Sequence, residues 1–241
     1  MVEANADPVT VKVEPLRGIP VVTPGDDLAA FLINSIERAG GLVNGDVVVV
    51  AQKVVSKAEG RLVSASTAEE REELIRSEAR RIRRRRGELF IVETRQGFVC
   101  ATAGIDRSNT PDEETVILLP VDPDASAREL SRKIGSYFDI VNPPLIISDS
   151  FGRAWRTGTV DIAIGVAGFA PLIDLRGQHD WVGRELESTQ VAVADELAAA
   201  AHLVMGKSDG IPGAIVRGAS VERCHGVATD LVMPIDRDLF L

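Results

Sequence analysis

The chain has 241 residues, and its 27 Lys and Arg against 36 Asp and Glu give a formal charge of −9. Hydrophobic residues make up 45% and charged residues 26%, which is typical of globular proteins and excludes disorder, collagen and coiled coil as descriptions of the whole chain. Two widely separated cysteines, no leader-like pattern in residues 1–8 and no apolar run of about 18 residues together predict a cytoplasmic protein.

The N-terminal part of the chain predicts one helix among strands. Asp26 and Asp27 can cap a helix in which apolar residues recur at helical spacing from Leu28 to Ala39. The unbroken apolar run at 46–51 is typical of a strand buried on both faces. The expected elements are a strand at 9–13, a short strand within 18–22, the helix at 28–39, the strand at 46–51 and its polar extension over 52–57.

The middle of the chain predicts a helix with charged ends. Ser66 and Glu69 fit a capping box, and the acidic first turn with a basic end favours a helix running to about Arg86. Residues 95–97 predict a hairpin turn. The other expected elements here are strands at 89–94, 98–102 and 116–119, a helix at 125–138 capped by Asp124, and a strand at 144–149.

The last third of the chain predicts a helix that begins at Ser188 or Thr189 and ends at Gly206, followed by a strand at 214–217. Strands and helices do not alternate strictly along the chain. The sequence therefore predicts an α+β fold with a mixed sheet. Candidate borders between sub-domains lie near 110–115 and 150–158.

Six of the seven residues from Arg80 to Arg86 are arginines. Such a cluster is typical either of a nucleic-acid or partner-binding patch, or of a solvated helix end whose cations complement the helix dipole. The rest of the chain is acidic and no aromatic residue interrupts the cluster, which favours the helix end. We expect no nucleic-acid site here.

Two aspartates follow predicted strands. Asp106 comes after the strand at 98–102, and Asp149 with Ser150 ends the strand at 144–149. Read alone, Asp106 predicts an Asx turn with the backbone. Carboxylates at strand ends also suit Mg²⁺, which takes one or two of them together with water and substrate phosphates.

Lysines and a glycine-bounded loop supply candidate phosphate contacts. Lys53 and Lys57 share one face if their segment is extended, so they either bind phosphate or lie at a solvated edge. The loop at 205–212 contains Gly-Lys-Ser but lacks the upstream glycine and the element order of a P-loop. Its backbone amides could still line a nucleotide.

Eight short segments, in this order, resemble the coenzyme F-420-0:L-glutamate ligase family, also called gamma-glutamyl ligase. The resemblance spans residues 18–218 and rests on the segments 18–22, 51–61, 103–109, 118–124, 147–156, 183–186, 193–197, and 210–212 with 216–218.

The resemblance implies a ligase reaction. GTP would phosphorylate the phospholactyl carboxylate of a deazaflavin, the amine of L-glutamate would displace the phosphate, and a second glutamate would join through the gamma-carboxylate. The number of glutamates added, the preferred ion among Mg²⁺ and Mn²⁺ and any need for a monovalent cation stay open. So does a related ligase acting on another cofactor carboxylate.

The resemblance also implies roles for particular residues. The divalent ion would be held by Asp106, Asp149 and Ser150, and Lys57 would be the recurring phosphate-contacting lysine. Lys207 stands where some members place a metal-ligating Glu, in a loop one residue shorter. The implied GTP contacts are Ile19, Pro20, Val21, Val22, Gln52, Lys53, Lys57, Asn109, Met205, Gly206, Lys207, Ser208, Asp209, Gly210 and Ile211.

The resemblance further implies a two-domain α+β subunit in an intertwined homodimer, formed by one ligase domain over residues 1–241 without the nitroreductase-like domain fused to some members. A protein of another class, binding nucleic acid or a partner through Arg80–Arg86 without catalysis, is the competing hypothesis.

Overall fold

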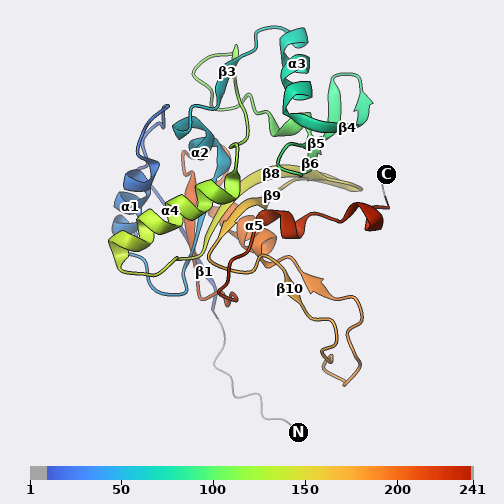
Figure 1. Cartoon of the computed structure of the whole chain (residues 1–241). Helices are drawn as coiled ribbons and strands as arrows, with labels where there is room; N and C mark the ends of the chain where they lie inside the picture. Colours follow the sequence, from blue (N-terminus) through green and yellow to red (C-terminus); the bar gives the residue numbers. More distant parts are fainter. Residues whose placement is uncertain (1–9, 240–241) are drawn as a thin grey trace.

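A computed structural model describes residues 10–239 of the protein. Its centre is a five-stranded mixed sheet, in which β2 and β8 run parallel and the other neighbours run antiparallel (Figure 1). The strand order is β1 (Lys12–Pro15), β12 (Gly213–Arg217), β2 (Val47–Ala51), β8 (Leu145–Arg153) and β9 (Arg156–Ala167). All four valines of β2 are fully buried, which confirms the predicted central strand.

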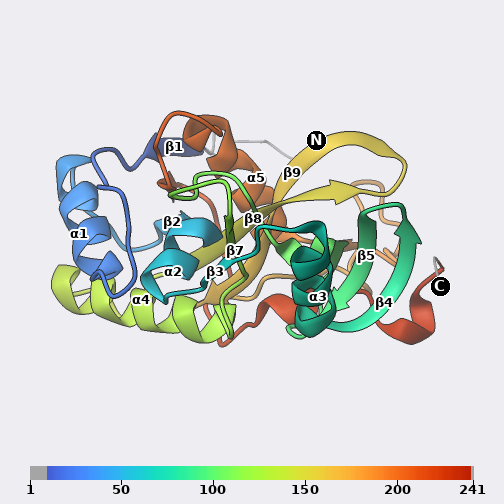
Figure 2. The same cartoon turned by 90° about the horizontal axis from the view of Figure 1, so that it is seen from above.

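Helices cover both faces of this sheet. Helix α4 (Pro123–Phe138) and helix α5 (Val193–Met205) lie on opposite sides of it, and α1 (Leu28–Arg38) packs beside α4 (Figure 2). Among residues 10–239 we find no helix that combines the length and apolar character of a membrane span. The mixed sheet and its flanking helices confirm the predicted α+β class.

A smaller layer lies beside the main sheet. Helix α3 (Ala68–Glu78) packs on a three-stranded sheet around a separate core that contains Ile75 and Phe90. The strands of that sheet are β4 (Ala79–Arg86), β5 (Leu89–Thr94) and β6 (Val99–Ala101).

The remaining elements are short. They are α2 (Gln52–Ala58), β3 (Leu62–Ser64), η1 (Thr102–Gly104), β7 (Thr115–Ile117), β10 (Ile173–Asp174), β11 (Gln190–Val191), η2 (Ala228–Leu231) and η3 (Ile235–Arg237).

The prediction that one helix continues to Arg86 is wrong, because α3 ends at Glu78 and the arginines form strand β4. Arginine has good helix propensity, but pairing with β5 overrides it. Arg83 pairs with Glu93 across the strands, and Arg85 lies over the Phe90 ring at 4.6 Å. These contacts favour a structural role for the cluster.

The extended reading of residues 52–57 is also wrong, since they form helix α2 directly after β2. Lys53 and Lys57 nevertheless share a face, because residues four apart are neighbours on a helix. The segment 18–22 is a loop and not a strand. Of the strand expected at 9–13, residue 9 lies outside the described residues, and β1 begins later, at Lys12.

Three helix starts differ from their predicted positions. The capping box uses Thr67 and Glu70, one residue beyond the predicted pair, and α5 begins at Val193, after the short strand β11. Asp122 caps α4, while Asp124 accepts backbone N–H groups from two other elements. The hairpin turn at 95–97, the helix end at Gly206 and the last strand are confirmed.

One ion pair joins β12 to the turn before β2. Arg217 donates to both oxygens of Asp46 at 2.8 and 2.9 Å, and Asp46 is only 1% exposed. The substitution Arg217→Met leaves a buried carboxylate without its cation. We expect it to lower the free energy of unfolding by about 3 kcal/mol. Urea denaturation measures this loss, and the dependence of the free energy on urea concentration should stay as in the wild type.

The matched control is Arg132→Met, which removes an exposed pair with Glu129. It should change the free energy of unfolding by less than about 1 kcal/mol. Equal effects of the two substitutions would contradict a stabilising role for the Arg217 pair.

Candidate functional site

A cavity of about 280 Å³ opens where β2 ends and its pairing with β8 stops. Because these two strands are parallel, with Ala51 opposite Ser148, the start of α2 lies beside the middle of β8. Most of the predicted site residues line it: Ile19, Pro20, Val21, Val22, Gln52, Lys53, Lys57, Asn109, Asp149, Ser150, Met205, Gly206, Lys207, Ser208, Gly210 and Ile211.

Two predicted residues do not line the cavity. Asp106 lies next to it, because its Oδ2 is 2.7 Å from Lys53 Nζ. Its Oδ1 accepts the Ser108 N–H at 2.6 Å, which confirms the predicted Asx turn. The Asp209 carboxylate is folded back against Gly206 in its own loop.

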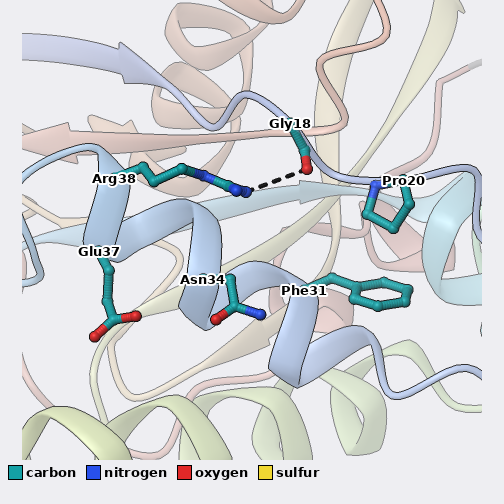
Figure 3. Close-up of a pocket in the computed structure, with 6 residues that line it drawn as sticks. All are labelled: Gly18, Pro20, Phe31, Asn34, Glu37 and Arg38. Atoms are coloured by element: carbon teal, nitrogen blue, oxygen red, sulfur yellow. Dashed lines mark hydrogen bonds between the residues drawn. The ribbon is translucent and has the colours of Figure 1, made fainter.

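A more open hollow of about 550 Å³ lies between residues 18–20 and α1 and shares Pro20 with the cavity (Figure 3). The one cation in its wall, Arg38, donates to the Gly18 carbonyl at 3.1 Å. Phe31, Asn34 and Glu37 are its other α1 side chains. This hollow offers no lysine for phosphate, so the smaller cavity is the candidate site.

Two lysines on one face of α2 carry the positive charge of the site. Lys57 donates to the Asn109 carbonyl at 2.6 Å, and Asn109 adopts a left-handed backbone with φ 58°. Partial burial, and then the charge of Lys53, lower the pKa of Lys57. Burial raises the pKa of Asp106, but hydrogen bonds from Lys53 and Ser108 outweigh it and keep that pKa below its usual value. An anionic ligand here would stabilise both ammonium groups.

Asp149 is the least solvated acid predicted for the site. Asp149 is the fifth of the nine residues of β8, because the strand predicted to end at residue 149 continues to Arg153 through its pairing with β9, and the residue is 8% exposed. Burial, together with the negative charges of Asp106 and Asp161, raises the pKa of Asp149 to about 6. Among residues 10–239 it forms no salt bridge. The group therefore lacks a cation of its own.

Asp161 and His202 are site residues that sequence reasoning missed. Asp161 is 4% exposed in the middle of β9, and both residues line the cavity. Ser148 donates to Asp161 at 3.1 Å, and the His202 Nδ1 atom lies 3.2 Å from it. The available signal was one charged residue inside the apolar run 160–167.

The donor set fits a hard divalent cation that also binds a ligand. Asp149 and Asp106 supply two carboxylates, within the number that Mg²⁺ takes from protein. In the part of the chain that the structure describes, no group of three or more His, Cys, Asp and Glu could hold a metal ion alone. The remaining ligands would therefore be water and phosphate oxygens.

Comparison with known proteins shows the family of the chain. The family described as F420-0:Gamma-glutamyl ligase matches residues 18–218. The chain belongs to this family. The match begins at the loop beside the cavity, ends just after β12 and includes every residue that lines the cavity.

Curated relatives agree with the family match. A "Coenzyme F420:L-glutamate ligase" of Methanothermobacter thermautotrophicus is 42% identical, with 93% of this chain and 96% of the relative covered. A protein of the same name from Methanopyrus kandleri is 43% identical, with 96% of this chain and 98% of the relative covered. Another, from Methanocaldococcus jannaschii, is 39% identical, with 82% of this chain and 85% of the relative covered.

The raised pKa of Asp149 predicts how stability depends on pH. Its charged form is disfavoured in the folded state, so ionisation costs stability as pH rises from about 4 to 6. With EDTA present, Asp149→Asn should raise the free energy of unfolding by about 2–3 kcal/mol at pH 8 and by well under 1 kcal/mol at pH 4. Chemical denaturation at the two pH values measures this difference.

The control is Asp139→Asn, at an exposed left-handed position after α4 that asparagine also tolerates. It should show no such pH-dependent gain. A destabilised Asp149→Asn variant at pH 8 would contradict the unpaired, buried carboxylate.

Proposed function

We propose that the protein is a GTP-dependent ligase that adds L-glutamate to the deazaflavin coenzyme F420-0. The first glutamate joins the phospholactyl carboxylate through its amine, and a second joins through a gamma-linkage, each by way of an acyl phosphate. The observation that carries the proposal is the family match over the whole cavity. The lysine pair beside a buried aspartate supports the phosphoryl chemistry.

The cavity has the groups that a triphosphate needs. Lys53 and Lys57 line it from α2, and most residues of the loop 205–211 line it as well. Gln52 is 1% exposed, its Oε1 accepts from Ser56 at 2.9 Å, and its Nε2 has no hydrogen-bond partner among the described residues. Since a buried unpaired donor is costly, this N–H₂ group favours a bound polar ligand.

Asp149 and Asp106 would hold the divalent ion, Mg²⁺ or Mn²⁺. When bound, that ion supplies charge neutralisation for the transferring phosphoryl group. Lys53 bridges Asp106 and the cavity, so it orients one carboxylate while it neutralises phosphate. The remaining catalysis is positioning of the reactants.

The reaction needs no side-chain nucleophile. An oxygen of the acceptor carboxylate attacks the γ-phosphorus of GTP and GDP leaves. The glutamate amine then attacks the acyl carbon and expels phosphate, which leaves an amide and releases a proton. Lys57, which lines the cavity and donates to the Asn109 carbonyl, is the residue we propose as catalytic through its contact with the transferred phosphate.

We further propose a homodimer as the working assembly and no nucleic acid as partner. The direct test incubates the protein with GTP, Mg²⁺, L-glutamate and the deazaflavin acceptor, and follows glutamyl additions by mass spectrometry. Additions that require both GTP and the metal support the proposal. A chain that binds GTP but adds no glutamate to this acceptor favours another cofactor carboxylate.

Removing the Lys57 ammonium should weaken GTP use more than glutamate use. A charge-assisted contact to phosphate contributes about 1.5–3 kcal/mol, so Lys57→Ala should lower kcat/KM for GTP by about ten- to a hundredfold. Steady-state kinetics with each substrate varied in turn measures the two effects.

Lys133→Ala is the control, because Lys133 is an exposed lysine of α4 that pairs only loosely with Glu129 and Asp27. It should leave both kinetic constants near those of the wild type. Equal losses for GTP and glutamate in Lys57→Ala would argue against a phosphate contact.

The Asp149 carboxylate should be essential for turnover. Asp149→Asn keeps the shape but removes the charge that holds the ion, so kcat should fall at least about a hundredfold. Excess Mg²⁺ or Mn²⁺ should restore only part of it. Wild-type turnover of Asp149→Asn at the same metal concentration would show that the ion is held elsewhere, and Asp139→Asn serves again as the control.

A further inference from the structure

Asp161 is a buried carboxylate that the proposed reaction does not use. It lies on β9 directly opposite Ser150 of β8, and a register shift between Ile147 and Ser148 sets this pairing. Ser148 and Ser150 both donate to it, and His202 of α5 approaches it at 3.2 Å. Lys207 Nζ lies 4.0 Å from the same carboxylate. Four polar side chains thus converge on one buried acid.

Charge is distributed unequally over the three acids of the site. Asp106 has Lys53 at 2.7 Å, and Asp161 has Lys207 at 4.0 Å. Asp149 forms no salt bridge with any residue of the described chain, although the Lys53 charge also acts on it. Asp149, and not Asp161, is therefore the acid without a paired cation.

Ser150 is engaged on both sides of its hydroxyl. Its O–H donates to Asp161, and its oxygen accepts from the Lys207 ammonium. A divalent ion on this neutral oxygen would lie beside the Lys207 ammonium and be repelled by it. Asp106 also has an ammonium beside it, but its carboxylate charge offsets that of Lys53. The arrangement therefore disfavours the predicted role of Ser150 as a metal ligand.

The loop backbone directs Lys207 to this place. Gly206 has φ 62° and ψ −164°, a conformation almost restricted to glycine. A Cβ at this position would lie 2.2 Å from an Asp209 carboxylate oxygen. The turn after α5 is thus shaped by Gly206 and Asp209, and it brings the next side chain to Ser150.

We propose that Lys207 is a resident cation of the site. Asp161 is the positioning residue that anchors it through Ser150, and its ammonium takes the position where a cation would otherwise bind between Ser150 and Asp161. The site then accepts a single divalent ion, at Asp149. A lysine has three N–H donors, so one stays available for a phosphate oxygen of the nucleotide.

This inference refines the metal site of the proposed function, but its test needs no GTP. Mn²⁺ alone is titrated into the folded protein, and free Mn²⁺ is counted by electron paramagnetic resonance. Lys207→Glu replaces the ammonium with a carboxylate, so Glu, Asp161 and the Ser150 hydroxyl become hard oxygen ligands for one cation. We expect this variant to bind one more Mn²⁺ per chain than the wild type.

Three further variants test whether the additional Mn²⁺ is bound at the position of Lys207. Lys133→Glu reverses the same charge on α4, outside the cavity wall, and should add no ion. Asp161→Asn in the Lys207→Glu background should abolish the gained ion. If that double variant fails to fold, as shown by its melting curve, Ser150→Ala in the same background should instead weaken the gained ion at least about tenfold.

Equal Mn²⁺ counts in the wild type and Lys207→Glu would overturn the proposal. So would a gained ion that is unaffected by loss of both Asp161 and Ser150. Failure of the proposed function would appear separately, as absence of GTP-dependent glutamate addition in a wild type that shows the expected ion count.

Discussion

The burial of one carboxylate, Asp149, is the constraint on which the rest of the site depends. It lies in the middle of β8, just past the pairing with β2, with 8% exposure, and the charges of Asp106 and Asp161 act on it there. A buried acid with no cation is unstable in its charged form. Lys53 pairs with Asp106, and Lys207 lies 4.0 Å from Asp161. In our proposals, a divalent ion that also binds the phosphates therefore neutralises Asp149.

The sheet makes this concentration of charge possible. Among the described strands, β2 and β8 are the parallel neighbours of the main sheet, so α2 starts beside the middle of β8. The lysines of α2 and the aspartate of β8 are thus held by a buried framework of valines and isoleucines. Binding residues on rigid strand ends can be positioned without a mobile segment, which suits a reaction that relies on alignment of phosphate and carboxylate.

Residues near strand ends and in short characteristic segments could be predicted from the sequence. Lys53, Lys57 and Asp149 line the cavity because their place follows from the apolar strands before them. Asp161 could not be predicted, since its partners depend on the bulge between Ile147 and Ser148 that sets the β8–β9 register. Strand β4 was missed for a related reason: only its contacts with β5 override the helix propensity of its arginines.

The central claim is that the cavity transfers phosphate from GTP to a carboxylate. The most direct measurement uses a deazaflavin acceptor labelled with ¹⁸O in its phospholactyl carboxylate, incubated with GTP, Mg²⁺ and L-glutamate. An acyl phosphate requires that one ¹⁸O atom leave with the inorganic phosphate when the amide forms. Mass spectrometry should therefore find one singly labelled phosphate for each first glutamate added, while a second addition, at the unlabelled gamma-carboxylate, releases unlabelled phosphate. Formation of the first amide with only unlabelled phosphate would contradict the account.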